Sequence, residues 1–542
     1  MSLKAGTLAR ALRTASDETG RLRTFFDDLD GQNGRDCDTG SNAELTLATM
    51  AEAVEDLNSD ESFLAAVESA VSAGIIRGAG NIAQLLTIIL ATWADAVDPV
   101  SDLSPLMVRN MLLTDPVRYP KAFNTWHPAI VYSMENARQA VGGHDMLIPE
   151  ITELVKNYAL DFELALVDHL MDNGTPLDPG AVVLSLFYIC LDASVRDDHT
   201  LIENFATVLK ELVETETMPS PHIRIPETSR AFTLDILIEG SSHDAEAVST
   251  HMVRLGAQHS YVGRTDLFGF GQWRFHVDTS APLAVYPRSA NVKSFRVTDN
   301  RPDDLIGVDT LVDSFTEGFT HRGIRLLERK PLQRVERAQV VALTQAPGMV
   351  EYLAQAGAVV LLNPTGIDID TLVMCARASS TGVCLVAPCH EAALTIARAA
   401  QQRLDAEQEA PRILIAPTHN DLDVLSIAAA CATIFVPQPG GREVAKTMEQ
   451  LLLSTSKATL EEDSVSRILS SDDEAVITAF EELSHKRPSL WRLLLGGDAG
   501  PQTTALVMQL ASAAPLTAND QPPEVIVIDG GFSGPSLLQA CQ

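Results

Sequence analysis

An acidic turn near the N-terminus contains the residues best suited to chemistry. The stretch 27–42 reads DDLDGQNGRDCDTGSN, in which glycines let the backbone turn back on itself while three carboxylates crowd together, those of Asp30, Asp36 and Asp38. These carboxylates repel one another unless a hard cation neutralises them, and Mg²⁺ is often held between carboxylates and nucleotide phosphates. The residue types therefore favour magnesium and nucleotide chemistry. A solvated Asp-rich turn is the alternative, and the ligand spacing of a calcium EF-hand is missing.

Helices must position this turn, because the chain from Ala5 to about Thr215 has a helical period. Apolar residues recur at three and four positions in AELTLATMAEAVEDL and in LIENFATVLKELVETE, and hardly any segment alternates with period two. Residues 1–217 are therefore predicted to form an all-helical domain. The stretch Met218–Arg230 has three prolines and no period, which predicts a linker.

Beyond the linker the pattern mixes strands and helices. Phe232–Ile238 and Trp273–Val277 have strand character around a helical stretch at Ala245–Leu255, which predicts a small α/β middle domain in residues 231–330. In residues 335–542 short apolar runs alternate with single helices, which predicts a C-terminal α/β domain with a largely parallel sheet and room for two sublobes. Its predicted strands are VVAL (340–343), AVVLL (358–362), VCLVA (383–387), ILIA (413–416), IFVP (434–437), 491–495 and 525–528. The acidic, Ser-rich stretch 456–475 is predicted to be an exposed connection.

The composition limits the classes of partner. The 542 residues are 46% hydrophobic and 21% charged, which is ordinary for globular protein and excludes collagen-like or wholly disordered chains. A net charge of −32 disfavours nucleic acid and anionic lipid surfaces. Because no window reaches about 18 uninterrupted apolar residues and no secretory apolar run is present, we expect no membrane insertion and a cytoplasmic location. Seven cysteines without CxxC spacing fit reduced thiols.

The acidic turn also carries a family resemblance. DCDTGSN, preceded by Asp30, resembles the DGDTGTN signature of the fatty acid kinase catalytic subunit family, which is related to the ADP-binding subunit of dihydroxyacetone kinase. Other landmarks follow in that family's order: GIIRGAGN (74–81) at a GARGNSG-like turn, Thr125 near a GT-containing turn, LDPGA (177–181) at a DAGG-like turn, FHVDT (275–279) at a VHVHT strand, and VIVIDGGFSGPSLL (525–538) at an HDGGQPLYP-type ending. The resemblance spans nearly the whole chain.

This resemblance implies an N-terminal antiparallel helical barrel that holds ATP and two magnesium ions at one end. By resemblance Asp30, Asp36 and Asp38 would be the metal ligands, with no catalytic residue implied beyond them. The implied nucleotide contacts are Ser41, Asn42, Arg77, Gly78, Gly80, Asn81, Thr125, Asp178 and Gly180. Metal held by carboxylates suits phosphoryl transfer, which depends on charge neutralisation more than on covalent help.

Several positions depart from the family pattern. Cys37 replaces a glycine beside the predicted metal ligands, and Ala79-Gly80-Asn81 replaces Asn-Ser-Gly, which removes a hydroxyl that could bind phosphate. Trp126 and His127 are bulky next to the predicted nucleotide turn, and Pro179 interrupts the last of the turns. These departures leave open a pseudo-kinase that binds metal or nucleotide without turnover.

Metal and nucleophile sites in the later domains are disfavoured. The family's middle domain binds zinc with one Cys and two His, whereas this chain offers only His276 and Asp278, and its strand FTLDILIEG has no Cys. An ordinary strand residue is the simpler interpretation of His276. In the C-terminal domain, Cys384, Cys389, His390, Thr418 and His419 follow or end predicted strands, where parallel sheets bind ligands, but no orienting partner for a Cys–His pair is identifiable.

The sequence therefore predicts an ATP- and Mg-dependent kinase resembling the fatty acid kinase catalytic subunit. Such an enzyme phosphorylates an acyl group presented by a separate lipid-binding carrier protein, and the C-terminal domains would dock that carrier or a second copy of the chain in a homodimer. One alternative is a non-catalytic pseudo-kinase acting as a nucleotide-binding, scaffold or regulatory protein. The other is a dihydroxyacetone-type kinase subunit, which is disfavoured because that system supplies its substrate-binding His on another subunit.

Overall fold

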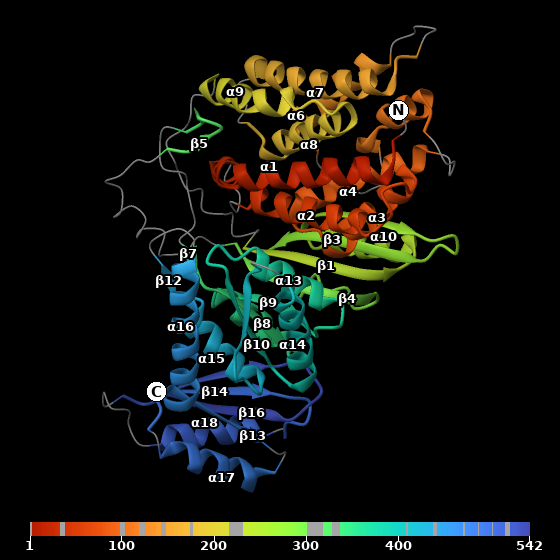
Figure 1. Cartoon of the computed structure of the whole chain (residues 1–542). Coiled ribbons are helices and arrows are strands. Elements are labelled where there is room, and N and C mark those ends of the chain that lie inside the picture. Colours follow the sequence, from red (N-terminus) through yellow and green to blue (C-terminus); the bar gives the residue numbers. More distant parts are fainter. Residues whose placement is uncertain are drawn as a thin grey trace.

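A helical N-terminal region is followed by mixed sheets, as the sequence predicts (Figure 1). The computed structural model describes residues 3–32, 38–97, 103–118, 126–142, 148–173, 177–215, 231–300, 318–327, 336–407, 410–436, 442–469, 472–485, 487–500, 502–514 and 521–542. The predicted linker at 218–230 lies outside these residues. In Figure 1 the helices form the upper layer, a large sheet lies beneath them, and a smaller sheet lies at the lower end.

Amphipathic helices around one large apolar core form the N-terminal region. They are α1 (Ala5–Gln32), α2 (Thr39–Glu55), α3 (Phe63–Arg77), α4 (Gly80–Ala96), α5 (Pro105–Leu112), the 3₁₀ turn η1 (Pro116–Arg118), α6 (Pro128–Val141), α7 (Ile151–Asn173), α8 (Pro179–Arg196) and α9 (Thr200–Thr215). Arg10 near the start of α1 donates to the carbonyl of Ser194 near the end of α8 at 3.2 Å. Consequently α1 and α8 run in opposite directions, and the end of α1 lies near the start of α8.

Helix α8 is long and apolar enough, by length and composition alone, to cross a membrane. In the structure 89% of this 18-residue stretch is buried inside the protein. Its aromatic residues pack within the helical core, where Tyr188 contacts Tyr158, Phe162 and Trp93. A central core helix accounts for its hydropathy.

One sheet of mixed direction joins the middle and C-terminal segments. Its strand order is β11-β10-β8-β9-β4-β1-β3-β2. The antiparallel part consists of β1 (Phe232–Gly240), β2 (Gln258–Thr265), β3 (Gly271–Thr279) and β4 (Asn291–Asp299), and the parallel part consists of β8 (Gln339–Thr344), β9 (Val359–Leu362), β10 (Val383–Pro388) and β11 (Arg412–Ile415). The two parts meet where β4 pairs with β9 in antiparallel register, at Arg296↔Leu361 and Val297↔Val360. They also share one apolar core.

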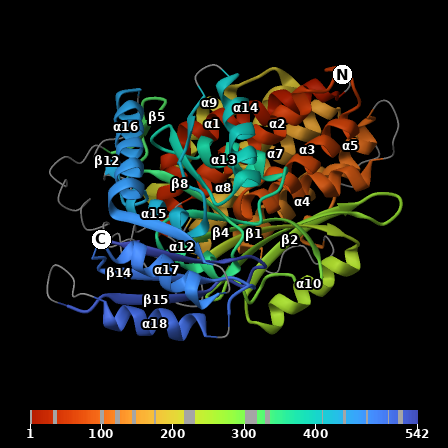
Figure 2. The ribbon, with the colours of Figure 1, turned by 90° about the horizontal axis from the view of Figure 1, so that it is seen from below.

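The antiparallel part has a helix layer on each face. Leu234, Ile236 and Ile238 of β1 pack in one core with α10 (Ser242–Arg254), because successive strand residues point to opposite faces. Leu237 of β1 and Val262 of β2 instead belong to the core of the helical region. Figure 2 shows β1 and β2 lying between α4 and α10. The face of Asp235 and Leu237 is therefore the face on which the N-terminal helices sit.

The parallel part follows the predicted βαβ pattern. Its covering helices are α12 (Val350–Gln355), α13 (Asp368–Arg377), α14 (Glu391–Asp405), α15 (Asp421–Cys431) and α16 (Arg442–Ala458), with the 3₁₀ turn η4 (Pro347–Met349) after β8. The predicted strand at 434–437 is not part of this sheet, because β12 (Phe435–Val436) pairs antiparallel with the two-residue β7 (Glu336–Arg337). The short strands β5 (Thr320–His321) and β6 (Ile324–Arg325) pair with each other.

A separate four-stranded sheet with its own core ends the chain. Its order is β13-β16-β14-β15, formed by β13 (Ser464–Leu469), β14 (Leu490–Leu495), β15 (Glu524–Asp529) and β16 (Ser536–Cys541), with α17 (Asp473–Ser484) and α18 (Thr503–Ala513). The prediction of an exposed connection at 456–475 was wrong. This stretch contains the end of α16, a π-helical turn η5 (Thr459–Asp463) and β13, because β13 gains its hydrogen bonds from the distant strand β16.

Candidate functional site

Helices α2, α4, α6 and α8 all begin at one end of the helical region. A Cβ placed on Gly80, the first residue of α4, would lie 2.5 Å from Nδ2 of Asn42 in α2. A Cβ placed on Gly180, near the start of α8, would lie 3.9 Å from Ile130 in α6 and 3.9 Å from Leu85 in α4. Helix N-termini carry unsatisfied N–H groups and partial positive charge, so their convergence makes this end favourable for anions.

Two of the three predicted metal ligands lie together at this end. Asp30, fully buried in the last turns of α1, accepts a hydrogen bond at 3.3 Å from the backbone N–H of Asp38, the N-cap residue of α2. Asp36 lies outside the described residues. No group of three His, Cys, Asp or Glu side chains arranged for a metal is found in the part of the chain that the structure describes.

Asp27, to which the sequence assigned no role, fixes the start of α2. Its Oδ1 accepts from the N–H groups of Gly40 (2.7 Å) and Ser41 (3.1 Å), and its Oδ2 accepts from the Ser41 hydroxyl (2.8 Å). Burial raises the pKa of Asp27 to about 6, although these hydrogen bonds and nearby Arg23 oppose the shift. The hydroxyl proton of Ser41, a predicted nucleotide contact, is thus donated to Asp27.

The turn between α3 and α4 lies directly against α2. Gly80 has a positive φ of 67°, which favours glycine, and its neighbour across the gap is Asn42. The Ala79 N–H donates to Oγ1 of Thr46, one helical turn beyond Asn42, at 3.3 Å. The predicted nucleotide contacts Asn42, Gly78, Gly80 and Asn81 are therefore brought together, and Arg77 ends α3 beside them.

The starts of α6 and α8 lie at the same end of the helical region as the starts of α2 and α4. Asp178 is the N-cap residue of α8, and its Oδ1 accepts from the Ala181 N–H at 2.9 Å. Pro179 does not interrupt the turn as predicted: it occupies the first helical position, where the N–H it lacks is not needed. His127 caps α6 in the same way, accepting from Ala129 at 3.3 Å. Thr125 lies outside the described residues.

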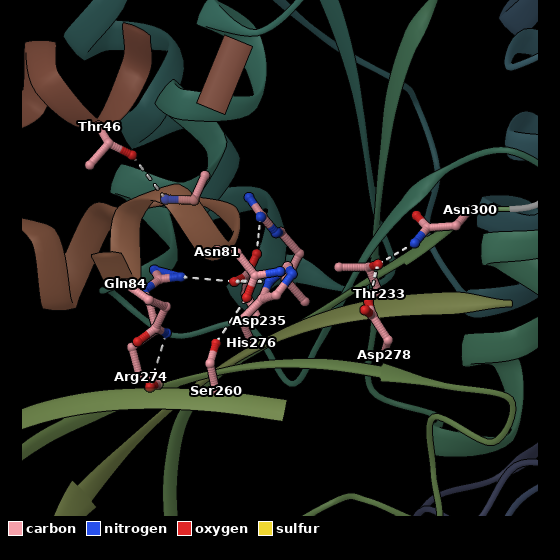
Figure 3. Close-up of polar contacts among 12 residues, drawn as sticks. Thr46, Asn81, Gln84, Thr233, Asp235, Ser260, Arg274, His276, Asp278 and Asn300 are labelled. Atoms are coloured by element: carbon pink, nitrogen blue, oxygen red, sulfur yellow. Dashed lines mark hydrogen bonds and ion pairs between the residues drawn. The ribbon is translucent and has the colours of Figure 1, made fainter. Parts of the chain in front are cut away.

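A buried ionic cluster on the large sheet faces the turn between α3 and α4 (Figure 3). Asp235 of β1 contacts Arg274 (3.5 Å) and His276 (3.2 Å) of β3 and pairs closely with Arg296 of β4. Burial alone would raise the pKa of Asp235, but Arg296, His276 and Arg274 outweigh burial and hold it well below its usual range. Burial likewise opposes the charge of Arg296, yet Asp235, helped by Asp38, leaves its pKa raised. The cluster thus lies within electrostatic reach of the acidic turn.

His276 and Asp278, the remnants of the family's zinc pattern, have different partners. His276 shares Asp235 with two arginines, whereas Asp278 accepts from the hydroxyl of Thr233 at 2.8 Å. Asn300 also donates to the Thr233 hydroxyl (Figure 3). A hydroxyl and an amide are poor zinc ligands compared with thiolate and imidazole, so this donor set suits hydrogen bonding.

Residues at the carboxyl ends of β8 and β10 hold local structure together. Thr344 donates to Asp421 at the start of α15, and Thr418 donates to the carbonyl of Pro388 at 2.7 Å. His390 caps α14. Burial raises the pKa of the Cys389 thiol, which keeps it protonated and unsuited to nucleophilic attack.

The charged sheet residues were missed by reasoning from the sequence. Asp235, Arg274 and Arg296 each interrupt an apolar strand, in LDIL, WRFHV and SFRVT. A charge within each of these three strands was the signal available for a buried polar face, since adjacent strands can align such charges.

No known family model matches this chain, and no curated protein matches its sequence.

The first prediction concerns the pH dependence set by Asp27. Its raised pKa means that the folded state keeps a proton that the unfolded chain has lost, so its contribution to stability falls as pH rises from about 4 to about 6. Asp27→Asn should remove this fall, which amounts to roughly 3 kcal/mol for a shift of about two units. Urea denaturation from pH 4 to 8 measures it as the difference between wild type and variant. Asp60→Asn, at an exposed carboxyl between α2 and α3, should keep the wild-type profile, and a parallel profile for Asp27→Asn would contradict the assignment.

The second prediction tests the contact between Gly80 and Asn42. Gly80→Ala should lose about 1–2 kcal/mol from backbone strain alone, and more because its Cβ must displace Asn42. Gly256→Ala is the matched control, because Gly256 has a similar φ of 71° and nothing within 4 Å of the added Cβ. Equal losses for the two variants, measured by urea denaturation, would show that Asn42 moves away without cost.

Proposed function

We propose that this chain is an ATP- and Mg-dependent phosphotransferase resembling the fatty acid kinase catalytic subunit, which phosphorylates an acyl group presented by a lipid-binding partner. The observation that carries the proposal is the convergence of four helix starts with Asp30 and Asp38 at one end of the helical region. In this proposal the helices of residues 1–217 form an antiparallel barrel whose open end holds the nucleotide.

The residues at this end fit a metal-bound nucleotide. Carboxylates are the ligands that Mg²⁺ prefers, and Asp30 and Asp38, with Asp36, would hold it. Asn42, the Gly78–Asn81 turn and the Asp178–Gly180 start of α8 would hold the phosphates and the nucleotide. Glycine is needed where backbones come closest: a Cβ at Gly40 would lie 2.5 Å from the Arg23 carbonyl, and one at Gly78 would lie 2.4 Å from the Gly74 carbonyl. When bound, magnesium would supply the charge neutralisation on which phosphoryl transfer depends.

The chain's own groups would bind and orient the nucleotide, and none would act as a nucleophile on its phosphate. Asp27 holds the first N–H groups of α2 in a fixed direction through Gly40 and Ser41, so the acidic turn enters the helix at a defined angle. Arg77 would add positive charge beside the turn. Groups that are already in place cost no rearrangement when charge develops on a phosphate, which is how a site without a covalent nucleophile can act.

The remaining parts of the chain would serve association. We place the docking of the carrier protein, or of a second copy of the chain, on the segments that follow the helical region, and we place the protein in the cytoplasm. The six cysteines of the described residues are buried and free, which is compatible with a reducing compartment.

One observation favours a second function, nucleotide binding without turnover. The N–H of Ala79 is donated to Thr46, and the hydroxyl proton of Ser41 is donated to Asp27. Ser41 is a position where the resemblance implies a nucleotide contact, and Ala79 lies within the Gly78–Asn81 turn. A pseudo-kinase would keep the magnesium and nucleotide affinity and lack transfer.

The third prediction is that Mg²⁺-dependent ADP binding, measured by calorimetry, requires Asp38. Asp38→Asn should weaken binding of ADP at least about tenfold, because it removes a full charge from the proposed metal ligands. Asp56→Asn, at the exposed C-terminal end of the same helix, should leave the affinity within about twofold of wild type.

Two outcomes separate the candidate functions. Binding of ADP that depends on Asp38, together with ADP release from ATP when an acyl acceptor on a lipid-binding protein is added, supports the kinase. The same binding without release for any acyl or dihydroxyacetone-like acceptor supports the pseudo-kinase. A wild-type protein that binds no ADP in the presence of Mg²⁺ would contradict both.

A further inference from the structure

The large sheet touches the α3–α4 turn on both sides of its glycines. Arg274 of β3 contacts the end of α3. Ser260 of β2 contacts Asn81 at the start of α4 (Figure 3). We propose that Ser260 and Arg274 are positioning residues for the Gly78–Asn81 turn, so the sheet is part of the nucleotide site. This inference rests on the proposed function of that turn.

Arg274 ends α3 by occupying its last carbonyls. Its Nε donates to the carbonyl of Ile75 at 2.8 Å and its Nη2 donates to that of Ile76 at 2.9 Å. The last carbonyls of a helix have no intrahelical partner, and a cation there is favoured by the helix dipole. The rigid fork of the guanidinium therefore fixes the direction in which the chain leaves α3, two residues before Gly78.

The same arginine is connected to the helix on the other side of the turn. The backbone carbonyl of Arg274 accepts a hydrogen bond from the Gln84 amide of α4 at 3.2 Å. Its side chain is held from the sheet side by Asp235, which also binds Arg296. One residue thus sets the spacing between the helix that enters the turn and the helix that leaves it.

Ser260 sets the orientation of Asn81. The buried Ser260 hydroxyl donates to Oδ1 of Asn81 at 3.0 Å, so the acceptor end of that amide points to the sheet. Within the described residues no hydrogen bond to the NH₂ end is found, and because Asn81 is exposed its two donors can face a ligand. Without the hydroxyl the amide could rotate and present its oxygen to a phosphate, which would repel it.

The ionic cluster suits positioning better than stabilisation. Burying charged groups costs desolvation energy that their mutual attraction barely offsets, so an apolar interface of the same shape would be about as stable.

A second link joins the strand pair β2–β3 to the same two helices. Arg264 of β2 contacts Asp95 of α4 (3.1 Å) and Glu68 of α3 (3.7 Å). Asp95 lies 14 residues after Asn81, about 21 Å along the helix. The link through Arg264 attaches the sheet to the helices far from the turn, whereas Ser260 and Arg274 contact the residues at the turn. The two roles can therefore be tested with separate variants.

The fourth prediction compares two variants at the turn with two matched controls. Ser260→Ala should weaken the affinity for ADP with Mg²⁺ about three- to tenfold, as expected for one lost hydrogen bond that orients a ligand group. Arg274→Lys keeps the positive charge but loses the planar guanidinium that binds two carbonyls, and should weaken the affinity for ADP at least about tenfold. Arg264→Ala removes the link far from the turn, and Ser249→Ala removes a hydroxyl hydrogen bond to His259 (2.7 Å) on β2. Both controls should stay within about twofold of wild type in calorimetry.

Amide hydrogen exchange of the protein without nucleotide provides the independent readout. In Ser260→Ala and Arg274→Lys the amides of residues 79–82 should exchange about tenfold faster than in wild type, whereas the two controls should match wild type there. Wild-type affinity in Ser260→Ala with unchanged exchange would overturn the inference. If the wild-type protein binds no ADP, the proposed function fails, while faster exchange at the turn still establishes that the sheet positions it. Should Arg274→Lys not fold, Ser260→Ala alone decides.

Discussion

The buried carboxylate of Asp235 is the charge around which the contact between sheet and helices is organised. It holds Arg274, His276 and Arg296 on one face of the sheet, and without it two guanidinium groups would be buried beside each other without the carboxylate that pairs with both. Arg274 in turn reaches the last carbonyls of α3, and Arg296 lies within electrostatic reach of Asp38. The position of the glycine turn therefore traces back to a residue in a strand about 155 residues downstream.

This dependence explains why the helical region alone does not complete the site. The starts of α2, α4, α6 and α8 come together through the packing of the helices themselves, as the contacts of Gly80 and Gly180 show. The direction of the donors at the α3–α4 turn, however, is set by Ser260 and Arg274. Apolar packing brings the four helix starts together and tolerates small shifts. The direction of the donors at the turn depends on hydrogen bonds, which are directional and do not tolerate such shifts.

Sequence reasoning was most successful where periodicity is strong. The helices of residues 5–215 and the parallel strands β8 to β11 follow from local apolar patterns. Strands β2 and β13 do not, since QHSYVGRT and SVSRIL have weak alternation and depend on partners that are distant in the chain or separated by a hairpin. At the candidate site, Asp30 and Asp38 were proposed from their crowding and lie together in the structure, while the contacts of Asp27, Arg274 and Ser260 were not predicted. Their roles come from groups that only the tertiary structure brings to them.

The pairing of β4 with β9 also bears on how the chain can be divided. A fragment that ends near residue 330 would remove β9 and expose the edge of β4, with its unpaired N–H and carbonyl groups at Arg296 and Val297. Such an edge invites pairing with other chains, so residues 231–330 are poorly suited to isolation, although their sequence pattern resembles an independent module. The sheet itself is one unit that runs from β1 through β11. Any recombination that exchanges the middle segment between related proteins must carry the parallel strands with it.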